Sequence, residues 1–450
     1  MAYIANTPDD VRVMLGAIGL DSLDQLFDMI PPEYRLRRPL AIPEALSELE
    51  LTSHIGALAS QNQGADVRPC FLGGGSYDHF IPAVVDNLAS RGEFYTAYTP
   101  YQPEASQGTL QATFEYQTLI TQLTGMDVSN ASLYDGGSAV TEAVLMAMTS
   151  TRRLGRVVVA GSIHPEHIQI LRTNLANLEP EVVVVPPSEG MVRAEDLAAA
   201  ITDDTAAVVV AYPNFFGQLE EVDKLVEVIK ARGALAIVSV DPIGLGLLRR
   251  PGDFGADIVV GEGQSLGNPL GYGGPYLGIL ACRDEFVRKM PGRVVGQTLD
   301  RQGKRCFVLT LQTREQHIRR EKATSNICTN QGLLALRASI YLAALGPKGL
   351  REVAELSTRK AHYAADRLAE VPGLSIAFPG PFFKEFVVRS KKDPVAVLAE
   401  IGRLGYHGGI ALGRWYPELK DAILIAVTEK RTKAEIDGLA EAYRKALGAA

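Results

Sequence analysis

The sequence predicts an α/β protein whose larger domain contains a mainly parallel sheet, preceded by a helical arm and followed by a smaller α+β domain. Short β-branched apolar runs alternate with helical patterns through the middle of the chain, whereas the beginning is helical and the end is mixed. A length of 450 residues exceeds what one ordinary core accommodates. We expect an arm at 1–70, a large domain at 71–330 and a small domain at 331–450.

Two helices are predicted in the arm. Apolar residues recur at helical spacing between Thr7 and Met29, with Thr7 as a plausible cap and Pro31 and Pro32 ending the pattern. The segment Pro43–Asn62 has the pattern of a second amphipathic helix.

The large domain is predicted from strands that alternate with helices. Runs that are apolar on both faces indicate a sheet covered on two sides. The predicted strands are Arg156–Ala160, Val182–Val185, Ala206–Ala211, Leu235–Val240 and Asp257–Val260. The helices between them are Pro165–Leu178, Ala194–Ile201 and Glu221–Arg232.

The C-terminal part begins with a long helical stretch, Gln331–Leu345, and a second one, Gly349–Leu368. Shorter strands and a closing helix follow. The strands are Leu374–Phe378, Glu385–Val388 and Ala422–Ala426, and the helix is Lys433–Leu447. This order predicts an α+β domain joined to the large domain by a bridging helix.

Composition excludes several classes of protein. A net charge of −7 argues against nucleic acid as the main partner, because phosphate backbones are bound by clustered Lys and Arg. The 4 cysteines are far apart and form no zinc or disulfide pattern. The segment Met1–Gly19 lacks the basic-then-apolar order of an export signal, and no stretch approaches the ~20 apolar residues of a membrane span. We therefore expect a protein of the cytoplasm that binds no membrane.

The first candidate site segment is the glycine cluster at Gly73, Gly74 and Gly75, followed by polar and aromatic residues up to His79. Glycines there could let backbone amides approach a phosphate or another ligand closely. Such runs are more often plain turns, so the cluster alone is a weak indication.

The second candidate is the loop Tyr95–Gly108. It is too rich in proline and polar aromatics for a core helix, and it offers Tyr98, Tyr101 and Glu104 on a segment stiffened by prolines. A surface loop or an oligomer contact is about equally compatible with this composition. The alternatives coincide if the site lies at an interface.

The third candidate is the start of the helix that runs from Asp135 to Met148. Gly137 and Ser138 lie in its first turn, where free amide groups and the helix dipole can bind an anion. A simple capping turn has the same pattern.

The fourth candidate is Asp241, at the end of the strand Leu235–Val240. A carboxylate at this tip lies where open α/β sheets bind ligands, and in pyridoxal-phosphate enzymes such an acid pairs with the pyridinium nitrogen. In the fold-type-I, aspartate aminotransferase-like class of these enzymes, a lysine follows the next strand. Gln264 stands there instead, and an amide cannot form a Schiff base.

Several segments together resemble the glycine decarboxylase P-protein family. The longest and most specific match runs from Leu311 to Cys328. Others are Gly73–His79, Tyr95–Gly108, Asn130–Asp135, Pro213–Gly217, Gly271–Pro275 and Thr428–Thr432. The resemblance extends over nearly the whole chain, and the absence of lysine at position 264 matches the first subunit of the two-subunit form.

The resemblance implies a fold-type-I large domain and a decarboxylase of glycine. Together with a lysine-bearing second subunit, which would hold pyridoxal phosphate covalently, the chain would transfer the aminomethyl group to the lipoyl arm of the carrier H-protein and release carbon dioxide. A pair of heterodimers is implied. We expect Tyr98, Tyr101 and Glu104, and also Arg314–Asn326, to complete the partner's site.

On the same resemblance, Gly137, Ser138, His164, Asp241 and Gln264 would form a vestigial cofactor cradle in this chain. His164 follows the strand Arg156–Ala160, where this class often places a residue that stacks on the cofactor ring. We favour a capping or hydrogen-bonded loop histidine for it. No metal is expected.

Two rivals remain open. One is a self-sufficient pyridoxal-phosphate enzyme that uses another lysine, with Lys289 and Lys322 as the nearest candidates. The other is a purely structural or regulatory pseudoenzyme, for which the loop Tyr95–Gly108 would tolerate substitution.

Overall fold

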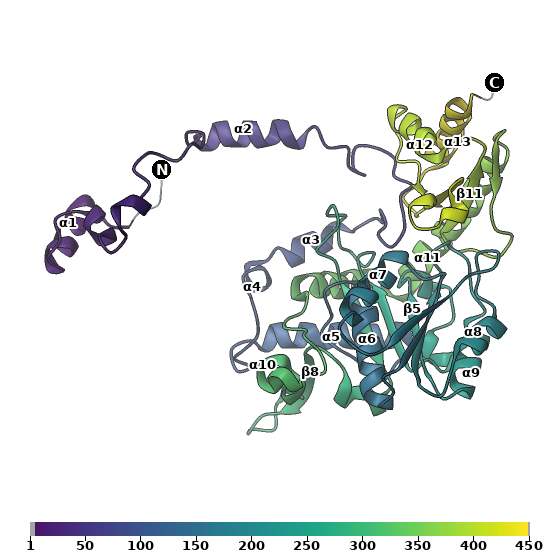
Figure 1. The fold of residues 1–450 in the computed structure, drawn as a ribbon, viewed down its shortest axis with the longest axis horizontal. Coiled ribbons are helices and arrows are strands. Elements are labelled where there is room, and N and C mark those ends of the chain that lie inside the picture. Colours follow the sequence, from purple (N-terminus) through teal and green to yellow (C-terminus); the bar gives the residue numbers. More distant parts are fainter. Residues whose placement is uncertain (1–4, 449–450) are drawn as a thin grey trace. The chain divides into compact units, whose positions relative to one another are not determined.

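The structure is a computed structural model that describes residues 5–448. The chain divides into two compact units, Met1–Asn62 and Gln63–Ala450 (Figure 1). The second unit contains all of the sheets and every residue of the site described below.

The first unit consists of α1 (Pro8–Ala17), two 3₁₀ turns (Leu23–Phe27 and Pro32–Tyr34) and α2 (Glu48–Ala59). Capping boxes begin both α-helices, Thr7 with Asp10 and Ser47 with Glu50. The prediction of one helix from Thr7 to Met29 is wrong in its second half. The backbone turns at Gly19, whose φ of 75° ends the helical path.

A seven-stranded sheet forms the centre of the second unit, in the order β1-β7-β6-β5-β4-β2-β3. The strands β2 to β6 pair in parallel, while β7 runs antiparallel to both β6 and β1. Their bounds are β1 Val128–Ser129, β2 Arg156–Ala160, β3 Glu181–Val185, β4 Thr205–Tyr212, β5 Leu235–Val240, β6 Ile258–Glu262 and β7 Gly278–Cys282.

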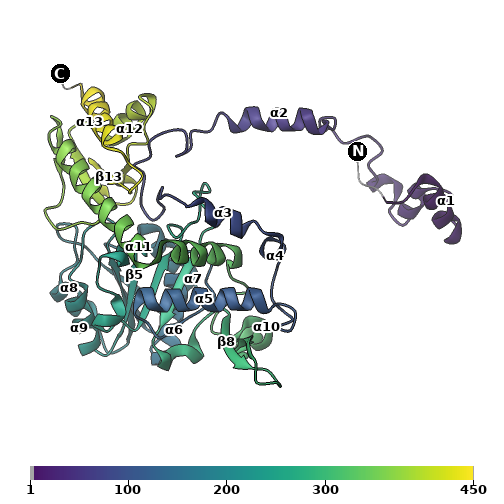
Figure 2. The same cartoon turned by 180° about the vertical axis from the view of Figure 1, so that it is seen from behind.

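Helices cover both faces of this sheet (Figures 1 and 2). On one face α6 and α7 pack together, and α5 packs with the first half of α11 on the other. The bounds are α3 Ala83–Ala89, α4 Gly92–Tyr95, α5 Gln107–Thr124, α6 Gly136–Thr151, α7 Pro165–Leu175, α8 Ala194–Ala200, α9 Val222–Ala231 and α11 Gly332–Ala369. This arrangement is the two-sided α/β layer that the sequence predicts.

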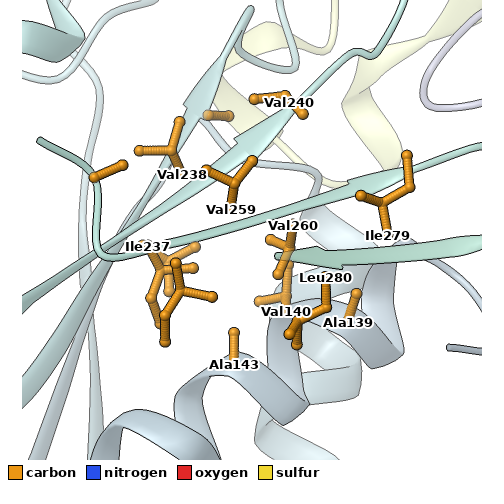
Figure 3. Packing of buried hydrophobic residues seen from close by; sticks show 14 of the residues in the cluster. Ala139, Val140, Ala143, Ile237, Val238, Val240, Val259, Val260, Ile279 and Leu280 are labelled. Atoms are coloured by element: carbon orange, nitrogen blue, oxygen red, sulfur yellow. The ribbon is translucent and has the colours of Figure 1, made fainter. Parts of the chain in front are cut away.

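Small and β-branched side chains fill the space between α6 and the sheet. Figure 3 shows Ala139, Val140 and Ala143 of α6 facing side chains of β5, β6 and β7, such as Val260 and Leu280. All five of these side chains are fully buried. Alanines on the helix let it approach the sheet closely, and the branched residues of the strands fill the remaining volume.

The second unit ends in a four-stranded antiparallel sheet of order β10-β11-β13-β12, covered by the second half of α11 and by two further helices. Their bounds are β10 Leu374–Ile376, β11 Glu385–Ser390, α12 Pro394–Arg403, β12 Ile410–Ala411, β13 Ala422–Ala426 and α13 Lys433–Leu447. A separate hairpin, β8 Val294–Leu299 with β9 Arg305–Thr310, leads into the short helix α10 Gln316–Arg319.

The long helix α11 bridges the two sheets. Gly346 has non-helical backbone angles, so α11 is two helices joined at a kink before Pro347, as the two predicted segments indicate. By length and composition alone α11 is apolar enough to cross a membrane. Its first half is packed into the core through Ala335, Ala338 and Tyr341, which is the behaviour of a core helix.

Candidate functional site

A small cavity of about 70 Å³ lies at the carboxyl ends of β4, β5 and β6. The residues that line it come from the large sheet, from the loop after Gly73 and from the start of β11 in the small sheet. It is lined in part by Tyr77, His164, Asp241, Glu262, Lys384 and Glu385. This is the edge of the sheet at which parallel α/β proteins bind ligands.

Asp241 follows β5 directly, and its carboxylate has two partners within the chain. Its Oδ1 accepts a hydrogen bond from the backbone N–H of Ile243 at 3.0 Å. Its Oδ2 lies 2.6 Å from Nζ of Lys384, whose side chain is only 1% exposed. Lys384 immediately precedes β11, so this ion pair joins the large sheet to the small one.

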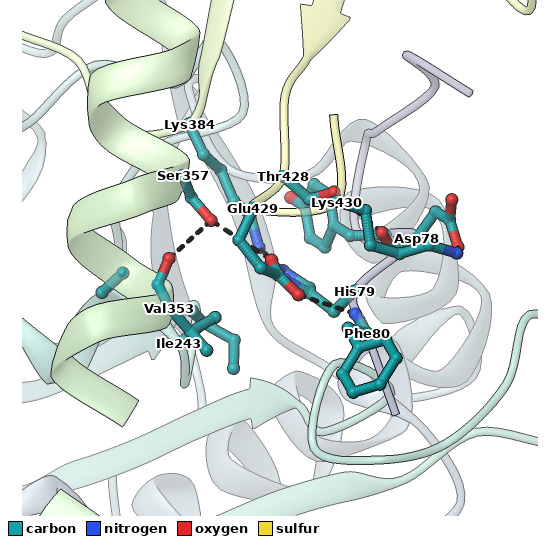
Figure 4. Close-up of polar contacts among 12 residues, drawn as sticks. Asp78, His79, Phe80, Ile243, Val353, Ser357, Lys384, Thr428, Glu429 and Lys430 are labelled. Atoms are coloured by element: carbon teal, nitrogen blue, oxygen red, sulfur yellow. Dashed lines mark hydrogen bonds and ion pairs between the residues drawn. The ribbon is translucent and has the colours of Figure 1, made fainter. Parts of the chain in front are cut away.

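His79 also contacts the Lys384 ammonium, with 3.0 Å between Nε2 and Nζ. Its other ring nitrogen, Nδ1, lies 2.6 Å from Glu429 (Figure 4). Because the ammonium can only donate, Nε2 must accept, and the ring proton is on Nδ1 and points to Glu429. Burial and the neighbouring Lys384 lower the pKa of His79, which favours this neutral form.

Tyr77 and Glu385 form a second polar group beside the ion pair. The Tyr77 hydroxyl donates to Glu385 at 2.8 Å, and the backbone N–H of Gly74 donates to the other oxygen of that carboxylate at 2.7 Å. Burial raises the pKa of Glu385 to about 7. The glycine cluster is thus tied to the start of β11, and a Cβ at Gly73 would lie 2.2 Å from Glu385.

Gln264 lies two residues beyond β6 and is buried. Its carbonyl oxygen accepts from the backbone N–H of Tyr77 at 2.8 Å, and its amide nitrogen donates to the carbonyls of Tyr77 and Asn268. Both ends of the side chain are therefore engaged by backbone. The amide holds the loop at Tyr77 against the sheet.

The first turn of α6 is occupied by carboxylates of the chain itself. Asp135 caps the helix by accepting from the backbone N–H of Ser138 at 2.8 Å, and Glu262 accepts from the N–H of Gly136 at 2.9 Å. At Gly137 a Cβ would lie 2.4 Å from the side chain of Ile170, so this glycine is packed closely. Burial raises the pKa of Glu262 to about 7.

His164 caps the start of α7. Its Nδ1 accepts from the backbone N–H of Glu166 at 3.1 Å, so its Nε2 carries the proton and donates to the carbonyl of Gly74 at 2.7 Å. Its ring stacks on His167, with 4.6 Å between the ring centroids. The His164 ring therefore links the start of α7 to the glycine cluster through its hydrogen bond to Gly74.

Tyr98, Tyr101 and Glu104 lie in the loop between α4 and α5 and are all exposed. The two tyrosine side chains are 87% and 70% exposed, so neither is needed for the core. Tyr98 lines a cavity of about 230 Å³ together with Arg293, Thr329 and Asn330. The structure thus brings this loop next to the end of the long sequence match Leu311–Cys328.

The segment Arg314–Asn326 borders another cavity, of about 280 Å³, next to Arg288 and Lys289. Arg314 is anchored there by hydrogen bonds to the carbonyls of Leu311, Met290 and Gly292. The cavity has a basic lining, since Arg288, Lys289 and Arg319 all contribute to it.

The residues at Asp241 do not fit pyridoxal phosphate. The amine that would hold the cofactor is replaced by Gln264, and the acid that would pair with its ring is engaged by Lys384. The helix end that would bind its phosphate meets two carboxylates, Asp135 and Glu262.

Sequence reasoning missed Lys384, Glu385, Glu262 and Glu429 as members of this cluster. The signal was present at Lys384 and Glu385, because two ionisable residues at the start of a buried strand require partners. Pairing them with Asp241 and Tyr77 requires the tertiary fold, since their partners lie more than a hundred residues away in sequence.

The sheet order and the position of the cluster define the class of protein: this is the fold of the fold-type-I pyridoxal-phosphate-dependent enzymes. A glutamate decarboxylase from Lactobacillus brevis shares the fold, with a TM-score of 0.70 and 12% identity over 94% of this chain and 97% of that one. Residues 1–443 match the family model described as glycine cleavage system P-protein. The chain belongs to this family.

Relatives of similar length share about half of their residues with the chain. A protein of Carboxydothermus hydrogenoformans named probable glycine dehydrogenase (decarboxylating) subunit 1 is 54% identical over 98% of this chain and 99% of its own. A crystal structure of glycine decarboxylase (P-protein) of the glycine cleavage system, in inhibitor-bound form, superposes with a TM-score of 0.92 and 45% identity, covering 99% of this chain and 100% of that one.

Proposed function

We propose that this chain is the lysine-less subunit of a two-subunit glycine dehydrogenase (decarboxylating). With a lysine-bearing second subunit it decarboxylates glycine, passes the aminomethyl group to the lipoyl arm of the H-protein and releases carbon dioxide. Pyridoxal phosphate, held covalently by the second subunit, supplies the electron-withdrawing ring that stabilises the carbanion. The chain acts in the cytoplasm and is inactive alone.

One observation carries this proposal: position 264 has a carboxamide whose two ends are both bonded to backbone. No amine is available there for a Schiff base. The full-length relatives named subunit 1 support the same division of labour, because that name implies a second subunit.

The chain's own contribution lies in its exposed polar segments. The loop with Tyr98, Tyr101 and Glu104 offers hydroxyls and a carboxylate that are exposed and make no contact within the core. Groups of this kind are free to complete a site in the partner. The basic cavity beside Arg314–Asn326 offers cationic side chains that can orient a carboxylate or line the entry of the lipoyl arm.

Isotope exchange between bicarbonate and the carboxyl group of glycine, with H-protein present, tests the proposal. The chain alone and the partner subunit alone should each give background exchange, and the mixture should recover the activity of the co-purified complex. Full exchange by the isolated chain would contradict the proposal and favour the self-sufficient rival. Full exchange by the isolated partner would favour the pseudoenzyme.

The structure gives no support to Lys289 or Lys322 as alternative anchors. Both side chains are exposed, and neither lines the cavity at Asp241. The lysine that does reach this cavity is Lys384, and its amine is engaged by the carboxylate of Asp241.

A further inference from the structure

We infer that Lys384 is an internal cation that takes the place of the cofactor's ring nitrogen at Asp241 and thereby closes this chain's cradle to pyridoxal-type ligands. Loss of the anchoring amine at position 264 is then not the only barrier to the cofactor. Restoring that amine is not sufficient to restore binding, because the acid at the end of β5 already has a cation.

The Lys384 ammonium has a partner in each direction in which it can donate. Its Nζ lies 2.6 Å from Asp241, 3.0 Å from His79 and 3.4 Å from the centroid of the Tyr77 ring, on which it stacks as a cation–π contact. An ammonium has three N–H donors, and the site supplies three acceptors for them: a carboxylate, an imidazole nitrogen and an aromatic ring.

The surroundings hold this ammonium in place. His79 accepts from it only because Glu429 fixes the ring proton on the opposite nitrogen, and Glu429 in turn also accepts from the backbone N–H of Phe80 at 2.6 Å. Figure 4 shows His79, Glu429 and Lys384 meeting between the loop after Gly73 and the small sheet. The cation is thus part of a network that spans three segments of the chain.

Lys384 cannot serve as a replacement for the missing anchor. In pyridoxal the aldehyde lies across the ring from the ring nitrogen, so an amine at the acid occupies the place of the nitrogen and not that of the aldehyde. A ring that entered would have to displace the ammonium. Since the Lys384 side chain is 1% exposed and that of Asp241 is 10% exposed, displacement would leave a buried charge without its partner.

Restoring the amine with and without Lys384 tests the inference. The variants are Q264K and Q264K/K384A, with Q264K/K391A as the matched control, since Lys391 is an exposed lysine just beyond β11. Each is co-expressed with the partner subunit and incubated with pyridoxal, which lacks the phosphate that Asp135 and Glu262 would repel. Borohydride then adds hydride to the carbon–nitrogen double bond formed with loss of water, and peptide mass analysis quantifies the adduct at position 264.

We expect Q264K/K384A to carry about tenfold more adduct at position 264 than Q264K at the same pyridoxal concentration, because breaking a buried ion pair opposes entry by at least that factor. Q264K/K391A should behave like Q264K. Equal labelling of Q264K and Q264K/K384A would overturn the inference, and so would the absence of adduct from both.

A double-variant cycle keeps the inference testable if Q264K/K384A does not fold. D241N, K384M and D241N/K384M are compared with the unaltered chain by urea unfolding of the purified full-length protein. If the two groups form the coupled pair, each single change destabilises strongly and the double change costs clearly less than their sum. Additive effects would show that Lys384 does not neutralise Asp241, and the inference would fall.

Discussion

At the scale of single residues, several buried carboxyl groups gather around α6 and the site. Burial raises the pKa of Glu142, Glu262 and Glu385 to about 7 in each case. Glu142 lies on α6, and its Oε2 is buried with no hydrogen-bond partner among the described residues. This oxygen is therefore buried without the hydrogen-bond partner that an ionised carboxylate requires.

We predict that Glu142→Gln changes how stability depends on pH. The folded chain binds the Glu142 proton more tightly than the unfolded chain, whose ordinary pKa is 4.5, so this group's contribution to stability is lost as pH rises from 4.5 towards 7. The free energy of unfolding of the variant, measured relative to that of the unaltered chain, should therefore be on the order of 1–3 kcal/mol higher at pH 8 than at pH 5, since each pKa unit is worth about 1.4 kcal/mol. Urea unfolding at both pH values measures this. A difference between the two proteins that is the same at pH 5 and pH 8 would contradict the shift.

The exposed loop gives a second prediction at this scale. Tyr98→Phe, Tyr101→Phe or Glu104→Gln should lower glycine turnover of the assembled complex by about tenfold or more, as expected for the loss of a positioned polar group. Co-purification with the partner subunit should be unchanged. Tyr34→Phe is the control, because Tyr34 is an exposed tyrosine of the first unit, 78% exposed. Unchanged turnover in all three variants would remove the loop from the site.

At the scale of elements, the spacing of apolar residues predicts the bounds of several strands and helices that are buried on one or two faces. The strands β2, β5 and β13 and the helix α13 have the predicted bounds, because β-branched runs and a Thr432 cap mark them clearly. The sequence reasoning did not identify α5 or β7. The helix α5 carries polar residues such as Gln117, which is buried and hydrogen-bonded to Val295, so its buried face does not stand out as apolar.

The site was predictable in part for a similar reason. Asp241 and Gln264 follow predicted strands, and strand ends of a parallel sheet meet at one edge, so local pattern places them. Lys384 lies immediately before β11 of the small sheet and reaches Asp241 across the junction of the two sheets. Asp135 and Glu262 accept from the first amides of α6, which the sequence pattern alone would leave free for an anion. The Asp135 cap is local and matches the capping turn that the sequence leaves open. The contacts of Lys384 and Glu262 join residues more than a hundred positions apart, so they depend on tertiary packing.

The start of α6 supplies a prediction for an element. Asp135→Ala removes the cap that accepts from the backbone N–H of Ser138, and we expect a loss of about 1 kcal/mol in the free energy of unfolding. Ser150→Ala is the control on the same helix, because its hydroxyl donates only to the carbonyl of Met146 one turn earlier. It should change stability by less than about 0.5 kcal/mol. Urea unfolding measures both, and equal losses would argue against a capping role for Asp135.

At the scale of the whole second unit, the two sheets meet where the turn after β4 touches the start of β11. Gly217 has a φ of 82°, and a Cβ there would lie 1.9 Å from the carbonyl oxygen of Glu385. The loop carrying Gly217 also accepts from the backbone N–H of Phe383 at 3.1 Å. The close approach of these two backbones fixes Lys384 and Glu385 at the large sheet.

We predict that Gly217→Ala disrupts this junction. Gly303→Ala is a matched control, because Gly303 has a φ of 77° but no atom within 4 Å of its Cβ position. The free energy of unfolding of the control should fall by about 1 kcal/mol, because it gains only backbone strain. Gly217→Ala adds a clash with backbone, so its free energy of unfolding should fall by more than about 3 kcal/mol, or the protein should fail to fold. Thermal unfolding distinguishes the two. Equal melting temperatures would show that the junction is not packed as described.

At the scale of the whole molecule, we propose that this chain contributes exposed polar groups to the active site while its partner subunit holds the cofactor covalently. Borohydride reduction of the native complex, followed by separation of the subunits and intact mass measurement, tests it most directly. The account predicts that this chain keeps its unmodified mass and that the partner gains one phosphopyridoxyl group. A phosphopyridoxyl group on any lysine of this chain would contradict it.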